Sequence, residues 1–139
     1  CGGCLEVLDQ HLQVSKYLPS VDELKGAVLY LETSEELPAS DVVYRFMSQL
    51  GERGILKNLS AILVGRPKTQ FAGALPPEGR EAFIQNQRDA MLRALAIYAP
   101  QPPIVFGLDF GHTDPQLLVP NGGIAEIDGS GKTISFSYT

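Results

Sequence analysis

Two residues that could transfer a proton each follow a short apolar run in this sequence. Glu32 comes directly after the run 27–31 (AVLYL), and His112 follows the run 104–108 (IVFGL). A carboxylate that accepts the N–H of an imidazole fixes its tautomer and stabilises the imidazolium, while the imidazole takes up and returns a proton near neutral pH. Glu32 and His112 are therefore the candidate catalytic residues.

Each of these residues also has an interpretation without catalysis. Glu32 opens the acidic run 32–36 (ETSEE), so it can be an ordinary solvated acid at a strand end. His112 lies between Gly111 and Pro115 in what we expect to be a shaped loop, where its ring can simply bond a backbone carbonyl. The residue types and their spacing leave both alternatives open.

A catalytic triad also needs a nucleophile, and the sequence provides no recognisable one. It contains no Gly-x-Ser-x-Gly elbow, and Ser34, the serine nearest to Glu32, lies in an acidic turn that disfavours an alkoxide. It contains no phosphate-binding Gly-x-x-x-x-Gly-Lys loop either. Arg66 in the segment Gly-Arg-Pro can bind a substrate carboxylate or form a structural salt bridge, and we expect the salt bridge.

The first four residues spell Cys-Gly-Gly-Cys, a spacing that occurs in redox and metal sites. A redox pair needs a strand and a helix N-terminus that lower the thiol pKa, and we expect no room for a first strand in this Gly-rich opening. Zinc needs about four ligands, and only His11 lies near Cys1 and Cys4. We expect neither function here.

Composition limits the class of protein. The 139 residues are 44% hydrophobic, which is enough for one domain with its own core. With 16 Asp and Glu against 11 Lys and Arg, the net charge is −5, which disfavours a nucleic-acid partner. No apolar run reaches the length of a membrane span, and no leader-like segment opens the chain. We expect a soluble, cytoplasmic protein with no membrane association.

The hydrophobic periodicity predicts a mixed α/β domain, because short apolar runs alternate with helical patterns. The first predicted helix covers 5–12. The second is capped by Ser40 or Asp41 and ends near Gly51 or Gly54, and the third covers 78–99 after a loop that contains Gly73. Predicted buried strands cover 27–31, 61–64 and 104–108, and a hairpin joins 123–127 to 133–138 through the turn 128–131. Continuous apolar strands indicate a parallel sheet, whose ligands collect beyond the carboxyl ends, where Glu32 and His112 both lie.

Several segments resemble the C-terminal domain of LD-carboxypeptidases, serine peptidases that include muramoyltetrapeptide carboxypeptidase and the microcin C immunity proteins. The match covers essentially the whole chain in the right order. The matching segments are 2–5 (GGCL), 29–36 (LYLETSEE), 54–56 (GIL), 62–67 (ILVGRP) and 109–115 (DFGHTDP). The residues at 32–36 (ETSEE) and 65–67 (GRP) resemble the microcin-immunity branch more closely than the peptidoglycan-recycling branch. Cys4 departs from the family, whose members often carry Asn after the paired glycines.

The resemblance implies a function for the two candidate residues. Glu32 and His112 would be the Glu and His of a Ser-Glu-His triad, whose Ser and oxyanion donors lie on an N-terminal domain outside residues 1–139. The implied fold is a layered β/β/α domain with a parallel central sheet and a smaller antiparallel sheet. The implied substrate is murein tetrapeptide or an aminoacyl-nucleotide conjugate, with no metal or cofactor, and the full-length protein would be a homodimer. Alone, this domain would be inactive.

Two alternatives from other functional classes remain open at this point. In the first, the domain binds a peptide without cleaving it, and Glu32 and His112 only form hydrogen bonds to the ligand. In the second, the domain serves dimerisation, and the apolar surface that its missing half would cover forms the contact.

Overall fold

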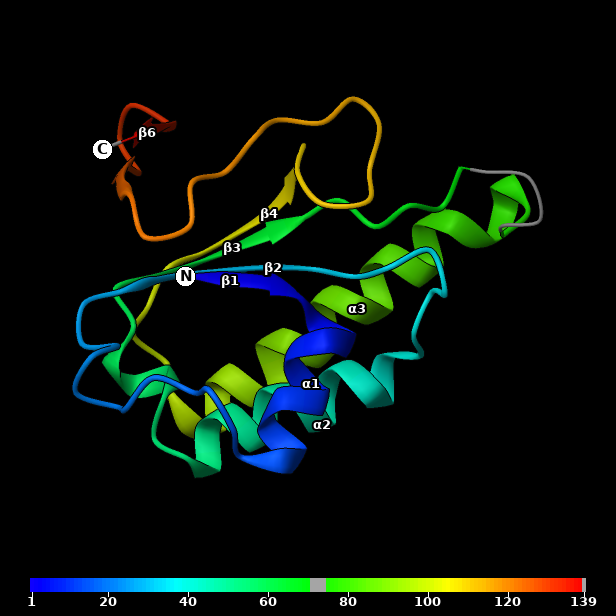
Figure 1. The fold of residues 1–139 in the computed structure, drawn as a ribbon. Helices are drawn as coiled ribbons and strands as arrows, with labels where there is room; N and C mark the ends of the chain where they lie inside the picture. Colours follow the sequence, from blue (N-terminus) through cyan, green and yellow to red (C-terminus); the bar gives the residue numbers. More distant parts are fainter. Residues whose placement is uncertain (71–74, 139) are drawn as a thin grey trace.

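The centre of the molecule is a parallel sheet of four strands, in a computed structural model that describes residues 1–70 and 75–138 (Figure 1). The strands lie in chain order and comprise β1 (Gly2–Cys4), β2 (Val28–Glu32), β3 (Ala61–Gly65) and β4 (Ile104–Leu108). Each strand pairs in parallel with its neighbour. Their carboxyl ends therefore meet at one edge of the sheet, as the sequence predicts.

Different layers cover the two faces of this sheet. Three helices lie on one face, namely α1 (Leu5–Val14), α2 (Ser40–Glu52) and α3 (Pro77–Tyr98). An antiparallel hairpin of β5 (Ile124–Asp128) and β6 (Thr133–Ser137) lies on the other (Figure 1). A short 3-10 helix, Leu56–Asn58, precedes β3. The predicted β/β/α layering, with a parallel central sheet and a smaller antiparallel one, is confirmed.

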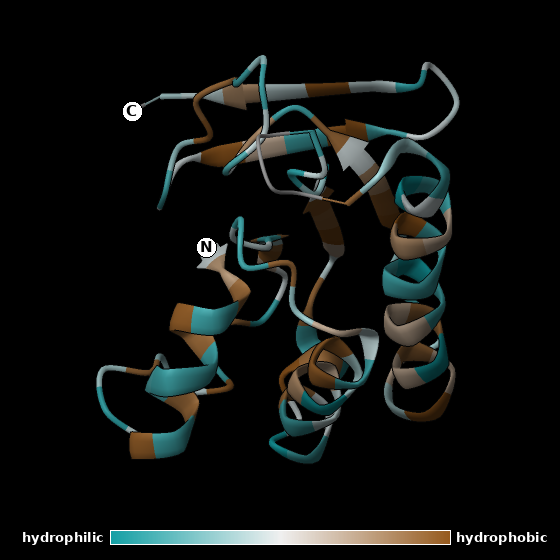
Figure 2. Cartoon of the chain, turned by 90° about the vertical axis from the view of Figure 1, so that its right-hand side faces the viewer, coloured by the Kyte–Doolittle hydropathy of each residue, from teal (hydrophilic) through white to brown (hydrophobic). Residues whose placement is uncertain are grey.

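The main hydrophobic core lies between the sheet and the helices. All five residues of β3 are buried, and the strands of the sheet are largely hydrophobic along their length (Figure 2). Leu31 from β2, Phe46 and Met47 from α2, and Ile62 from β3 are each at most 1% exposed. Within the part of the chain that the structure describes, no helix is both long enough and apolar enough to cross a membrane.

The short strand β1 contradicts our expectation that the Gly-rich opening leaves no room for a strand. Gly2 pairs with Tyr30, Gly3 with Leu31, and Cys4 with Glu32. The backbone of Gly2 has a φ of +149°, and a Cβ at this position would overlap the backbone of Tyr30. Glycine has no side chain that a hydrophobic pattern could detect, but at Gly2 it is the residue that allows β1 to pair closely with β2.

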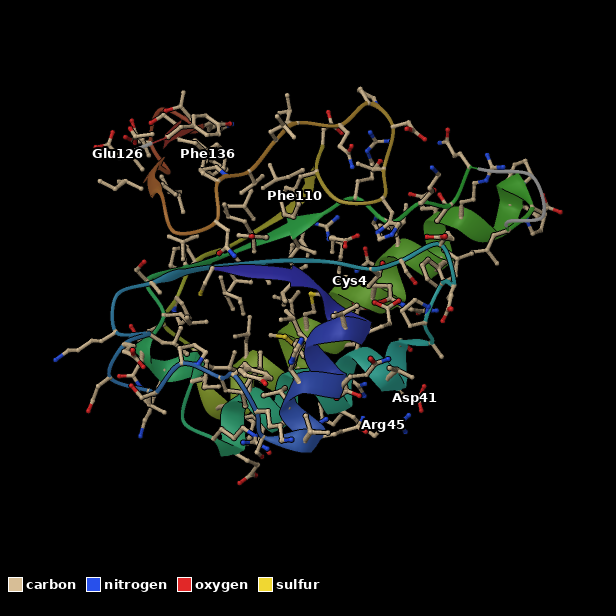
Figure 3. The ribbon with its side chains drawn as sticks, viewed as in Figure 1. Cys4, Asp41, Arg45, Phe110, Glu126 and Phe136 are labelled. Atoms are coloured by element: carbon tan, nitrogen blue, oxygen red, sulfur yellow. The ribbon has the colours of Figure 1, made fainter. Side chains whose placement is uncertain are left out.

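The predicted helices and strands are all present, with shifts of a few residues at their ends. The expected cap of α2 is wrong, because Ala39 precedes the helix, and neither Ser40 nor Asp41 caps it with its side chain. Asp41 instead accepts a hydrogen bond from Arg45 Nη1 at 2.7 Å, one turn further along the helix (Figure 3). Gly73, which we placed in the loop before α3, lies outside the described residues.

Two further predictions about the inner surfaces can be compared with the structure. On α3, Ala90, Met91, Ala94 and Leu95 are buried as predicted, whereas Phe83 and Tyr98 are half-buried and the polar Gln87 is buried as well. The turn of the hairpin is confirmed. There the Asp128 carboxylate accepts the backbone N–H groups of Ser130 and Gly131 at 2.9 and 3.0 Å.

The core beneath the end of β2 offers a test of this packing. Leu31→Ala removes a side chain that is 0% exposed, so we expect the free energy of unfolding to fall by about 2–5 kcal/mol. Leu118→Ala is the control, because Leu118 is 81% exposed and its loss should change stability by no more than about 0.5 kcal/mol. Urea denaturation measures both values, and equal losses would contradict the placement of this core.

Candidate active site

Glu32 is the last residue of β2, and its carboxylate is withdrawn from solvent. The side chain is 9% exposed, and its Oε2 lies 2.7 Å from Nδ1 of His112. The same oxygen accepts the backbone N–H of His112 at 3.1 Å. The structure therefore brings the two candidate residues together across 80 positions of sequence, and the alternative of a solvated strand-end acid does not describe Glu32.

The geometry assigns the tautomer of His112. An ionised carboxylate can only accept hydrogen bonds, so Nδ1 must carry the hydrogen in its contact with Glu32. In the neutral ring, Nε2 then keeps its lone pair and can accept a proton. This is the arrangement that a general base needs, with one ring nitrogen held by a carboxylate and the other available for chemistry.

The loop that carries His112 is held to the sheet by ion pairs. The guanidinium of Arg66, just beyond β3, donates to Asp109 Oδ1 from Nη2 at 2.6 Å and from Nε at 3.1 Å. Arg66 also donates to the backbone carbonyl of Asp114 at 3.2 Å, and Lys68 Nζ lies 2.9 Å from the Asp114 carboxylate. Arg66 therefore forms the structural salt bridge that the sequence favours over a substrate contact.

Two glycines allow this loop to approach β2 closely. A Cβ on Gly65 would lie 2.6 Å from the carbonyl oxygen of Phe110, a buried residue on the hairpin side of the sheet (Figure 3). Gly111 has a φ of +84°, and a Cβ there would overlap the side chain of Glu32. Larger residues at either position would push the loop away from the carboxylate that His112 contacts.

Negative charge surrounds the imidazole. The hydrogen bond that His112 donates to Glu32 raises the pKa of His112 above its ordinary value, partial burial opposes this, and the charges of Glu32, Glu35 and Glu6 raise it further. Glu35 is itself close, because its Oε2 lies 3.3 Å from Nε2 of His112. Our sequence analysis did not identify Glu35, since the acidic run 32–36 does not show which of its members turns toward the histidine.

A second carboxylate that sequence analysis missed is Glu6, at the start of α1. Its Oε1 accepts hydrogen bonds from the backbone N–H and the hydroxyl of Ser34, at 3.1 and 2.7 Å. Its Oε2 accepts the thiol of Cys4 at 3.3 Å. Glu6 thus ties the loop after β2 to α1, and the hydroxyl of Ser34 is bonded to Glu6 rather than to His112.

Cys4 lies at the end of β1 and directly before α1, the strand and helix N-terminus that a redox pair needs, but its thiol is not activated. Cys1 and Cys4 are both free thiols, and burial raises the pKa of Cys4, whereas a reactive thiol needs a lowered one. Among residues 1–70 and 75–138, no cluster of three or more His, Cys, Asp or Glu side chains is arranged to hold a metal ion.

An apolar pocket of about 130 Å³ lies at the same edge of the sheet as Glu32. Val64 and Phe106 from the sheet and Ile84 and Met91 from α3 form its walls, and Glu32 also borders it. The guanidinium of Arg88 stacks over the Phe106 ring at 4.9 Å from the ring centroid. The surroundings of Glu32 therefore combine the charged contact to His112 with an apolar surface of the size that a small side chain fills.

Gly111→Ala tests whether close approach of the loop maintains the contact between Glu32 and His112. The new methyl group would overlap Glu32 and break the hydrogen bond, so the pKa of His112 should fall. Gly107→Ala is the matched control, because Gly107 also has a positive φ, +77°, but open space around it. Both variants should lose about 1–2 kcal/mol to backbone strain. An NMR titration that shows the same His112 pKa in both variants would contradict this account.

The raised pKa of His112 also predicts how stability depends on pH. The folded state holds the imidazolium more tightly than the unfolded state does, so this stabilisation is complete below the ordinary pKa of 6.5 and is lost as the pH rises through the folded value. The stability advantage of the chain over its His112→Gln variant should therefore shrink as the pH rises from about 5.5 through the folded pKa of His112. Urea denaturation at a series of pH values gives the difference in the free energy of unfolding between the two proteins. An advantage that grows with pH would contradict the prediction.

Comparison with known proteins agrees with this architecture. A family model described as the LD-carboxypeptidase C-terminal domain matches residues 1–127. A MccF-like protein from Streptococcus pneumoniae, solved in complex with AMP, shares 29% identity at a TM-score of 0.74, over 99% of this chain and 39% of that one. The microcin C7 self immunity protein MccF in complex with aspartyl sulfamoyl adenosine shares 26% identity at a TM-score of 0.75, over 100% of this chain and 37% of that one.

A more distant structure shares the fold. Muramoyltetrapeptide carboxypeptidase from Oxalobacter formigenes is 24% identical at a TM-score of 0.68, over 96% of this chain and 41% of that one. The chain thus spans about two fifths of the length of the solved chains that it matches. Because the family model covers nearly all of the chain, the chain belongs to the LD-carboxypeptidase family, as its C-terminal domain.

Proposed function

We propose that this domain supplies the Glu and the His of a Ser-Glu-His triad in a serine-type carboxypeptidase. The observation that carries this proposal is the buried carboxylate of Glu32, which lies 2.7 Å from Nδ1 of His112. Each residue alone has an ordinary structural explanation. Together, at the carboxyl edge of a parallel sheet, they form the base and the orienting acid of a nucleophilic hydrolase.

In this mechanism His112 acts first as a base and then as an acid. Nε2 takes the proton of a serine hydroxyl as the serine oxygen attacks the carbonyl carbon of the substrate amide, and the same proton then goes to the leaving amine as the C–N bond breaks. Water then attacks the acyl-enzyme ester while Nε2 takes its proton, and the same proton returns to the serine oxygen as the ester C–O bond breaks. Glu32 keeps the hydrogen on Nδ1 and stabilises the imidazolium that forms twice in each cycle.

The serine in this proposal comes from an N-terminal domain of the same protein. Residues 1–139 would be the C-terminal domain, which is consistent with a family model of that description and with coverage of about two fifths of the solved relatives. Ser34, the serine nearest to Glu32 in the sequence, donates its hydroxyl hydrogen to Glu6 at 2.7 Å. The domain would therefore be inactive alone. We further propose that the full-length protein is cytoplasmic and acts as a homodimer.

The substrate class in this proposal is an amide next to a free carboxylate, either in murein tetrapeptide or in an aminoacyl-nucleotide conjugate. The solved relatives above 25% identity support the second, because their structures hold AMP and aspartyl sulfamoyl adenosine. The run 32–36 and the segment Gly-Arg-Pro at 65–67 point the same way. We therefore expect the aminoacyl-nucleotide conjugate to be the better substrate.

Substitution of the two residues in the full-length protein tests this function. Glu32→Gln and His112→Ala should each lower kcat by about 10²–10⁴, because either change removes the oriented base, and the double variant should be little worse than the slower single one. Glu126→Gln, on the exposed face of the hairpin (Figure 3), is the charge-matched control and should retain full activity. Chromatographic assays with both substrate classes give the rates.

Binding of the uncleaved substrate distinguishes the proposal from a binding module. A catalytic pair should leave the dissociation constant within about tenfold of the unsubstituted protein while turnover is lost. Retained turnover in both variants would refute the catalytic assignment, as would a loss of affinity with no turnover in the unsubstituted protein.

A further inference from the structure

We propose that Glu35 is a positioning residue that lies beside Nε2 of His112 and favours the imidazolium form of the ring until the serine hydroxyl approaches. This inference rests on the proposed function, because it concerns the nitrogen that would receive the serine proton. Glu35 Oε2 lies 3.3 Å from Nε2, an ion-pair distance. His112 thus has a carboxylate hydrogen-bonded to Nδ1 and a second carboxylate beside Nε2.

The protonation state follows from the two contacts. With the hydrogen of the neutral ring on Nδ1, Nε2 offers only a lone pair, which repels an ionised carboxylate. The charge of Glu35, 3.3 Å from Nε2, attracts the ring only when the ring is an imidazolium. Together with Glu32, 2.7 Å from Nδ1, it therefore favours the doubly protonated ring.

The two carboxylates differ in their freedom to move. Glu32 is 9% exposed and is fixed at the end of β2, whereas the side chain of Glu35 is 54% exposed. The backbone around Glu35 is held on both sides, by the bonds of Ser34 to Glu6 and by the hydrogen bond that Gln87 Nε2 donates to the Pro38 carbonyl at 2.5 Å. The Glu35 side chain can therefore turn into solvent without moving the loop. Nε2 then gives up its proton to solvent, and its lone pair becomes available to accept the proton of an incoming serine hydroxyl.

The other charges near the imidazole do not offset these carboxylates. Glu32 reaches His112 from β2, Glu35 from the loop after β2, and Glu6 from α1, and all three raise the pKa of His112. The cations beside the His112 loop are Arg66 and Lys68, and their charges are engaged with Asp109 and Asp114. Loss of the negative charge at Glu35 should therefore be visible in the titration of the ring.

An NMR titration of the 139-residue chain, labelled at histidine, tests this assignment, with His11 as a reference signal in the same spectra. Glu35→Gln should lower the pKa of His112, by less than Glu32→Gln does, and should leave the hydrogen of the neutral ring on Nδ1. Glu36→Gln is the matched control: it removes the same charge from the next position, which has no contact with the ring among the described residues. If Glu35→Gln and Glu36→Gln have the same effect, the proposal is wrong.

The full-length protein provides a second readout. Glu35→Gln should move the acid limb of the kcat/KM profile to lower pH, because that limb reports the pKa of the essential base in the free enzyme. An unchanged acid limb would overturn the role of Glu35. Failure of the proposed function is a separate outcome, since it appears as full activity in Glu32→Gln and His112→Ala, whatever the titration of the isolated domain shows.

Discussion

The hydrogen bond between Glu32 and His112 is the interaction on which the arrangement of this edge of the sheet depends. An ionised carboxylate that is 9% exposed is costly unless donors replace the water it has lost. Both donors to Oε2 come from His112, one from its ring and one from its backbone. The end of β2 and the loop after β4 must therefore come together, although 80 residues separate them.

Several features that have separate origins in the sequence serve this contact. The parallel order of the strands places the ends of β2, β3 and β4 side by side. Gly65 and Gly111 remove the side chains that would keep the loop away from Glu32, and the ion pair between Arg66 and Asp109 fastens the loop to the end of β3. The negative charge that collects around the imidazole favours its protonated form, which is the form produced when a base accepts a proton.

The sequence predicts the parts of this structure that have a regular hydrophobic pattern. The apolar runs at β2, β3 and β4 locate the sheet, and the rule that ligands collect beyond strand ends selects Glu32 and His112. Strand β1 carries no such pattern, because Gly2 and Gly3 have no apolar side chains, and Gly2 instead allows close approach to the backbone of Tyr30. Helix α2 begins after Ala39, although Ser40 and Asp41 are residue types better suited to capping.

The contacts of Glu6 and Glu35 could not be predicted from local pattern. Glu6 lies in the first turn of α1, where an acid is ordinary, and its bonds to Ser34 depend on the pairing of β1 with β2. The most direct test of the central claim is a crystal structure of the full-length protein. The account predicts a serine Oγ of the N-terminal domain within about 2.6–3.2 Å of His112 Nε2, with Glu32 still on Nδ1. A structure with no serine within reach of Nε2 would contradict it.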